Sequence, residues 1–175
     1  YTFFLYHPRI IIFKIVAPFS QLKAQFCKNS RTEADFFNIC LVSNYICIFH
    51  QNQFIANAEV ISGSGKRVEF AIKLPEGLLL PIDAKFPSGL YDNYLSAVDS
   101  SNSQSTKTAI DAIRRHVIND ANDINSKYIQ SGITIELGIM FIPSESLMQL
   151  IDSISDVREQ IFRDNRVCLL YTSPS

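Results

Sequence analysis

The sequence predicts a mixed α/β (α+β) fold built on one central sheet. Between residues 54 and 86, short segments with the period-two alternation of β-strands are separated by turns that contain Gly or Pro. After residue 90, helix-like and strand-like segments alternate, which is the order of crossover connections. The first pattern predicts an antiparallel meander and the second predicts parallel pairing. We therefore expect a mixed sheet with strand-strand-strand-helix-strand order and flanking helices.

The meander is expected to hold three strands joined by tight turns. The strands are predicted at residues 54–61, 67–74 and 78–86, with turns at 62–65 and 75–77. The turn that ends in Gly65 and Lys66 resembles a phosphate-binding loop only superficially. Val60 stands where that loop needs its first Gly, and Arg67 stands where it needs Ser or Thr. A hairpin turn is the expected structure.

The remaining elements follow from helical periodicity and capping residues. A short helix is expected over 90–98, and a polar loop over 100–105. A longer helix is predicted by apolar residues at spacings of 3, 4, 4, 3 and 4: Ile110, Ile113, Val117, Ala121, Ile124 and Tyr128. A buried strand is expected over 133–142, with Ser144 as the N-cap of the next helix. A further helical stretch leads to a last strand at 166–170.

Composition sets limits on function. The chain has 175 residues, enough for one domain, and its 16 Lys and Arg against 17 Asp and Glu exclude a strongly basic, histone-like binder. A nucleic-acid enzyme remains compatible, since it needs only a local basic strip. The four Cys residues lie in apolar surroundings without zinc spacing, so we expect reduced core thiols. No uncharged apolar run approaches the ~20 residues that a spanning helix needs.

The ends of the chain indicate a fragment. Residue 1 is Tyr rather than Met, and the last predicted strand has little chain after it to cover it. We expect a poorly defined and possibly non-native segment at 1–53, a core at 54–170 and an atypical tail at 171–175.

The segment from Glu69 to Lys85 carries the strongest chemical signal. Strand periodicity places Asp83 and Lys85 on one face, and Glu69 lies on the preceding strand. If the two strands pair, the acids can converge. Two carboxylates with phosphate oxygens and water make the oxygen-rich shell that Mg²⁺ prefers, and a nearby Lys can orient the attacking water. The alternative is an ordinary solvent-exposed face that carries an Asp–Lys pair.

The histidines suggest no catalytic group. His7, His50 and His116 are isolated in the sequence, with no Ser or Cys arrangement typical of nucleophilic catalysis. Because His116 follows Arg114 and Arg115, we expect a solvated or phosphate-facing basic patch there rather than a general base.

Four segments, in order, resemble the RmuC family of DNA recombination proteins. They are VEFAIKLP at 68–75, IDAKFP at 82–87, DINSKYI at 123–129 and IMFIPSE at 139–145. The resemblance extends over about residues 54–170. It implies a restriction-endonuclease-like nuclease core of the PD-(D/E)xK type.

The resemblance also implies roles for individual residues. Asp83 and Lys85 would be the (D/E)xK acid and lysine, and Glu69 the preceding acid, with both acids holding Mg²⁺ or Mn²⁺. Lys73 and Lys127 are weaker candidates for nucleic-acid contacts, whereas Tyr128 also suits the core. The sequence contains no Trp, so it lacks the family's Gly-x-Trp-Gly-Glu segment and any acid from it.

The function implied is Mg²⁺-dependent hydrolysis of DNA phosphodiester bonds in recombination or repair. DNA is the expected partner, with no small-molecule cofactor, no membrane contact by this fragment and a cytoplasmic location. The rival hypothesis is a non-catalytic DNA-binding or scaffold domain that keeps the nuclease-like fold.

Overall fold

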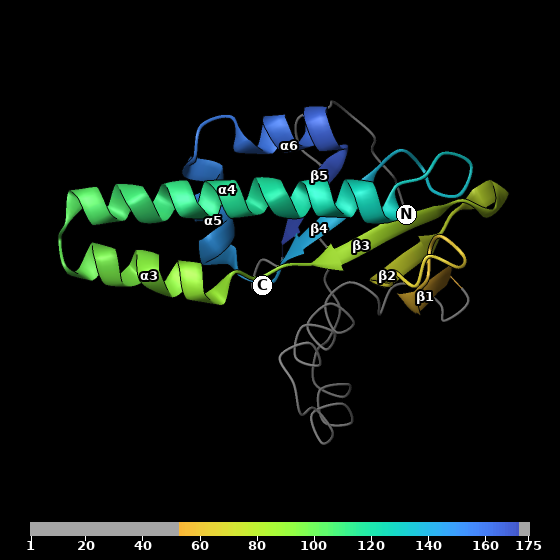
Figure 1. The fold of residues 1–175 in the computed structure, drawn as a ribbon, viewed down its shortest axis with the longest axis horizontal. Coiled ribbons are helices and arrows are strands. Elements are labelled where there is room, and N and C mark those ends of the chain that lie inside the picture. Colours follow the sequence, from red (N-terminus) through yellow and green to blue (C-terminus); the bar gives the residue numbers. More distant parts are fainter. Residues whose placement is uncertain (1–52, 172–175) are drawn as a thin grey trace, which may run out of the picture.

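A five-stranded mixed sheet with helices packed on it forms the fold, as the sequence predicts (Figure 1). The computed structural model describes residues 53–171. The strands are β1 (Phe54–Ala58), β2 (Val68–Lys73), β3 (Leu79–Ala84), β4 (Gly138–Ile142) and β5 (Val167–Tyr171). The helices are the 3₁₀ turn η3 (Pro75–Gly77), α3 (Ser88–Asp99), α4 (Ser103–Tyr128), α5 (Glu145–Ser153) and α6 (Val157–Asn165).

The strand order confirms both predicted patterns. The order is β1-β2-β3-β4-β5, in which β1–β2 and β2–β3 are antiparallel while β3–β4 and β4–β5 are parallel. The turn at 62–65 thus belongs to a hairpin, as expected, because it joins the antiparallel strands β1 and β2. Helices α3 and α4 form the crossover from β3 to β4, and Figure 1 shows α4 running back beside α3 and across the sheet.

The main core lies between the sheet and the helices. The predicted seam of α4 is confirmed, since five of its residues are buried: Ile113, Val117, Ala121, Ile124 and Tyr128. They pack with Met140 and Ile142 of β4 and with apolar residues of α5 and α6. A smaller cluster of Phe70, Ile82 and Phe141 lies on the other face of the sheet. Val68 and Ala71 of β2 belong to the same core, so this face of the sheet is packed rather than open to solvent.

Several element boundaries differ from the prediction: β1 ends at Ala58 rather than at 61, β3 ends at Ala84 rather than at 86, and the starts of α4 and β4 differ as well. Helix α4 begins at Ser103, so the loop expected over 100–105 is shorter, because the Asn102 side chain accepts a hydrogen bond from Ser105 N (3.0 Å) and caps the helix. Strand β4 begins at Gly138 rather than at 133. In the preceding turn, Thr134 Oγ1 accepts a hydrogen bond from Gln130 N (2.8 Å), and a single bridge to Leu79 is the only strand-like pairing there.

Other expectations are met in part. Ser144 caps α5 as predicted, with Oγ accepting a hydrogen bond from Leu147 N (3.2 Å). Cys168 is a free thiol, and burial raises its pKa. Three expected core thiols (Cys27, Cys40 and Cys47) and two histidines (His7 and His50) lie outside the described residues. Within residues 53–171, no helix is both long and apolar enough to span a bilayer.

Candidate functional site

Glu69 and Asp83 face each other across β2 and β3. The register pairs Phe70 with Ile82, so one further step along both strands brings Glu69 opposite Asp83. Directly opposed residues of antiparallel strands project to the same face. In addition, Glu69 Oε2 accepts a hydrogen bond from the backbone N–H of Ala84 at 3.3 Å. Because Ala84 directly follows Asp83, this bond holds the Glu69 carboxylate beside Asp83. The expected convergence of the two acids is therefore present.

Asp83 is buried, and its charge is balanced by Lys85. Only 2% of Asp83 is exposed, so the alternative of an ordinary solvent-exposed face is wrong. Lys85 Nζ lies 2.8 Å from Asp83 Oδ2 in an ion pair. No well-oriented hydrogen bond from the described part of the chain reaches this oxygen. A buried carboxylate oxygen in this state can accept a further cationic partner.

The crowding of charge shifts the protonation of Glu69 and Lys85. Burial and the neighbouring Asp83 charge raise the pKa of Glu69 from 4.5 to about 7. Burial alone would lower the pKa of Lys85, but the Asp83 carboxylate, with Asp120 and Glu69, raises it overall. At neutral pH the site thus holds a charged lysine and a glutamate that readily keeps a proton.

Helix α4 adds Asp120 to this site, which the sequence reasoning missed. Asp120 is partly buried, with 16% of its side chain exposed, and its Oδ2 lies 3.3 Å from His116 Nε2. Burial raises its pKa, while His116 and Lys85 act in the opposite direction. The available signal was its place next to Ala121 in the apolar seam, on the side of α4 that turns toward the sheet. His116 itself is exposed, in line with the expected solvated position.

Tyr128, also on α4, belongs to the hydrophobic core and lies near the acid pair. Its side chain is buried, as the seam predicts, and its hydroxyl donates a hydrogen bond to Arg67 O at 2.8 Å. Burial raises the pKa of Tyr128, with the negative charges of Asp83 and Glu69 adding to this effect. The end of α4 is therefore close to the acid pair.

The two lysines proposed for nucleic acid lie in different places. Lys127 precedes Tyr128 at the end of α4 and forms an i, i+4 ion pair with the exposed Asp123. Lys73 is exposed at the last position of β2, opposite Leu79, four residues from Glu69. Lys127 thus lies on the end of α4 that is near the acid pair, whereas Lys73 lies at the opposite end of β2 from Glu69.

The acid pair fits a divalent ion that also binds substrate oxygens. Within residues 53–171, no group of three or more His, Cys, Asp or Glu side chains could enclose a metal ion. Mg²⁺, however, is usually held by one or two carboxylates, with phosphate and water completing its shell. The oxygen of Asp83 that lacks an oriented hydrogen bond, opposite Glu69, meets that requirement.

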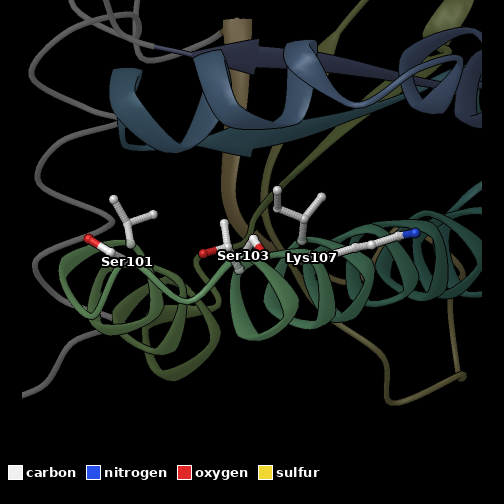
Figure 2. A pocket seen from close by; sticks show the side chains of 6 residues that line it. Ser101, Ser103 and Lys107 are labelled. Atoms are coloured by element: carbon white, nitrogen blue, oxygen red, sulfur yellow. The ribbon is translucent and has the colours of Figure 1, made fainter.

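A separate pocket lies away from these residues, where α3 meets α4. It has a volume of about 450 Å³ and opens widely to solvent; its lining is Val98, Ser101, Ser103, Thr106, Lys107 and Ile110. Figure 2 shows Ser101, Ser103 and Lys107 at this end of the helix pair. The pocket contains no acid and no partner for general base catalysis, so we do not assign chemistry to it.

Fold and site together define a mixed α/β protein in which a buried aspartate, a half-buried glutamate and a lysine come together at two neighbouring strands. A sequence model of the RmuC family matches residues 42–175, and the chain belongs to this family. The resemblance drawn from the sequence is thereby confirmed.

Two curated relatives come from strains of one bacterium. They are the DNA recombination protein RmuC homologs of Xylella fastidiosa strain Temecula1 / ATCC 700964 and strain 9a5c. Each is 29% identical over 103 residues, which cover 55% of this chain and 23% of the relative. The match therefore spans about a quarter of the length of these relatives. No solved structure gives a significant match.

Proposed function

We propose that this chain acts in DNA recombination and hydrolyses DNA phosphodiester bonds with Mg²⁺ or Mn²⁺. The observation that carries the proposal is the buried Asp83 Oδ2, which lies opposite Glu69 and receives no oriented hydrogen bond from the described residues. Burying the Asp83 carboxylate opposite the half-buried Glu69 is costly unless a cation compensates the charge. A bound metal ion, with a phosphate completing its coordination shell, would supply the compensating charge.

Each residue of the site has a distinct role in the proposal. Glu69 and Asp83 hold the ion, which when bound lowers the pKa of a water and neutralises charge on the phosphate. Because burial keeps a proton on Glu69 up to about pH 7, that proton must leave when the carboxylate binds metal. Lys85, held in its charged form by Asp83, can orient a water and offset the charge of the phosphodiester.

DNA binding requires contacts outside the acid pair. Lys127 is a proposed phosphate contact because the end of α4 lies close to the acids. Lys73 is a second, more distant candidate at the other end of β2. Lysine side chains bind backbone phosphates as point charges, without reading the base sequence.

A non-catalytic DNA-binding or scaffold domain is the second candidate function. It is favoured by the 2.8 Å ion pair between Lys85 Nζ and Asp83 Oδ2. This pair compensates the buried Asp83 without a metal ion, so the acid and the lysine could serve stability alone.

A cleavage assay separates the two functions. Labelled linear and forked DNA is incubated with the full chain and Mg²⁺ or Mn²⁺, with an EDTA control. Asp83→Ala and Lys85→Ala are compared with Glu136→Ala and Lys107→Ala, which remove exposed charges elsewhere. We expect metal-dependent cutting that falls at least about a hundredfold in the first two variants only, since both touch the reacting centre. DNA binding without cutting would favour the scaffold function.

A further inference from the structure

One hydrogen bond brings two lysines from distant parts of the chain together. Tyr128 Oη donates to Arg67 O at 2.8 Å, which fastens the end of α4 to the start of β2. The residue before each partner is a lysine: Lys127 before Tyr128, and Lys66 before Arg67. Lys66, in the β1–β2 turn, and Lys127, at the end of α4, are therefore brought near each other.

The electrostatics around Asp123 agree with this placement. The pKa of Asp123 is lowered first by its bond to Lys127, and the charges of Lys85 and Lys66 lower it further. Lys127 contacts Asp123 directly, and Lys85 and Lys66 lie near enough for their charges to act on it. Lys85 is already paired with Asp83. We call the other two, Lys66 and Lys127, the rim lysines.

Both rim lysines are available to a ligand. Lys66 is exposed, and its ammonium has no hydrogen-bond or ion-pair partner within residues 53–171. Lys127 is paired with Asp123, but Asp123 is exposed, and such surface pairs contribute little and exchange readily for another anion. A DNA strand offers a row of closely spaced phosphodiester charges, whereas Asp123 offers a single carboxylate.

We propose that Lys66 and Lys127 form a phosphate clamp that holds the DNA strand beside the phosphodiester placed at Glu69 and Asp83. Tyr128 is the positioning residue, because its bond to Arg67 sets the clamp's two halves. This inference rests on the proposed function and adds the residues that hold the substrate strand.

The distances along the chain suit a single strand. Lys66 is three residues before Glu69, so their Cα atoms are at most about 10 Å apart at ~3.3 Å per residue. One strand of B-form DNA carries a phosphate about every 3.4 Å of helix rise. This upper limit is compatible with the clamp and the acid pair contacting nearby phosphates of the same strand.

Equilibrium binding without metal tests the clamp independently of cleavage. The affinity of the full chain for fluorescein-labelled DNA is measured by anisotropy in EDTA, from about 50 to 200 mM salt. The variants are Lys66→Ala, Lys127→Ala and the double variant. Lys107→Ala is the matched control, since it removes an exposed lysine at the opposite end of α4 (Figure 2). Circular dichroism checks folding, and Lys127→Gln replaces Lys127→Ala if α4 loosens.

Each clamp lysine is expected to contribute one phosphate contact. We expect each single variant to weaken binding several-fold and to reduce the slope of log K against log salt by about 0.7–0.9. The double variant should lose about twice that slope, whereas Lys107→Ala should keep both values. Tyr128→Phe should weaken binding in the otherwise unchanged chain and have little further effect once Lys127 is gone.

Two outcomes overturn the inference in distinguishable ways. If Lys66→Ala and Lys127→Ala bind with the affinity and salt slope of Lys107→Ala, the clamp is wrong while the proposed function stands. If the unchanged chain does not bind DNA at all, the proposed function fails and the clamp fails with it.

Discussion

The carboxylate of Glu69 accepts a 3.3 Å hydrogen bond from the backbone N–H of Ala84, across the β2–β3 pair. This bond directs Glu69 toward Asp83, the residue before Ala84, although the charges of the half-buried Glu69 and the buried Asp83 repel each other. The ammonium of Lys85 compensates the charge of Asp83. Glu69, whose pKa is raised to about 7, keeps its proton up to about that pH. The site therefore combines an unfavourable charge arrangement with two carboxylates ready to share a cation.

Glu69 should make stability depend on pH when no metal is present. Its pKa is about 7 in the folded chain and near 4.5 when unfolded, so ionising it costs folding free energy. The free energy of unfolding should fall as pH rises through this window, and the loss is complete above pH 7. We expect Glu69→Gln to leave stability near pH 4.5 almost unchanged and to raise it at pH 8.

Urea unfolding in EDTA at both pH values measures this effect, with the exposed Glu136→Gln as the control. An equal stability change for Glu69→Gln at both pH values would mean that Glu69 titrates normally in the folded protein.

Removing the charge of Asp120 should change the pKa of Lys85. Asp120 is one of the carboxylates that raise the pKa of Lys85, so Asp120→Asn should lower that pKa. An NMR titration of lysine side chains labelled with ¹³C and ¹⁵N measures the shift directly. Asp111→Asn, an exposed acid earlier on the same helix, should leave Lys85 unchanged. Identical Lys85 titration in both variants would remove Asp120 from the site.

Tyr128→Phe should remove one hydrogen bond while keeping the aromatic ring in the core. Loss of the bond to Arg67 O should lower the free energy of unfolding by about 1 kcal/mol. Tyr94→Phe is the control, because the Tyr94 ring is half-buried against Tyr91 and its hydroxyl makes no hydrogen bond in the described structure. Chemical denaturation of both variants provides the comparison, and equal small losses would contradict a structural role for the Tyr128 hydroxyl.

Gly138 is required where β4 passes beneath α4. A Cβ added there would lie 2.9 Å from Ile124 Cγ2, so Gly138→Ala should lower the free energy of unfolding by about 1–3 kcal/mol. The double variant Gly138→Ala/Ile124→Ala should lose less than the sum of the single losses, because truncating Ile124 removes the contact. Gly89→Ala is the control, with open space around it in helix α3. Additive losses in the double variant would show that the close contact is not the cause.

The sheet was predictable because its strands alternate cleanly and its turns are short. The antiparallel meander and the apolar seam of α4 follow directly from periods of two and of three to four residues. The start of α4 was not predictable in the same way, because a run of Ser and Asn is compatible with a loop until Asn102 caps the helix.

The acid pair was predictable, but the burial of Asp83 was not. Strand alternation places Glu69 and Asp83 on one face, yet it does not reveal that Asp83 is buried there. The same tertiary packing brings Asp120 to Lys85, and no local pattern distinguishes this acid from the exposed acids of the helix. The strand order can be read from the sequence, whereas the environment of the site depends on the crossover helix.

Binding of Mn²⁺ tests most directly whether Glu69 and Asp83 form a metal site. Isothermal titration calorimetry compares the full chain with Glu69→Gln, Asp83→Asn and the control Glu136→Gln, with and without a short DNA that supplies phosphate. We expect one site per chain that strengthens with DNA, weakens at least about tenfold in Glu69→Gln and is lost in Asp83→Asn, because removing a carboxylate ligand removes part of the ion's shell. Equal Mn²⁺ binding by all four proteins, or none by the unchanged chain with DNA present, would contradict the assignment.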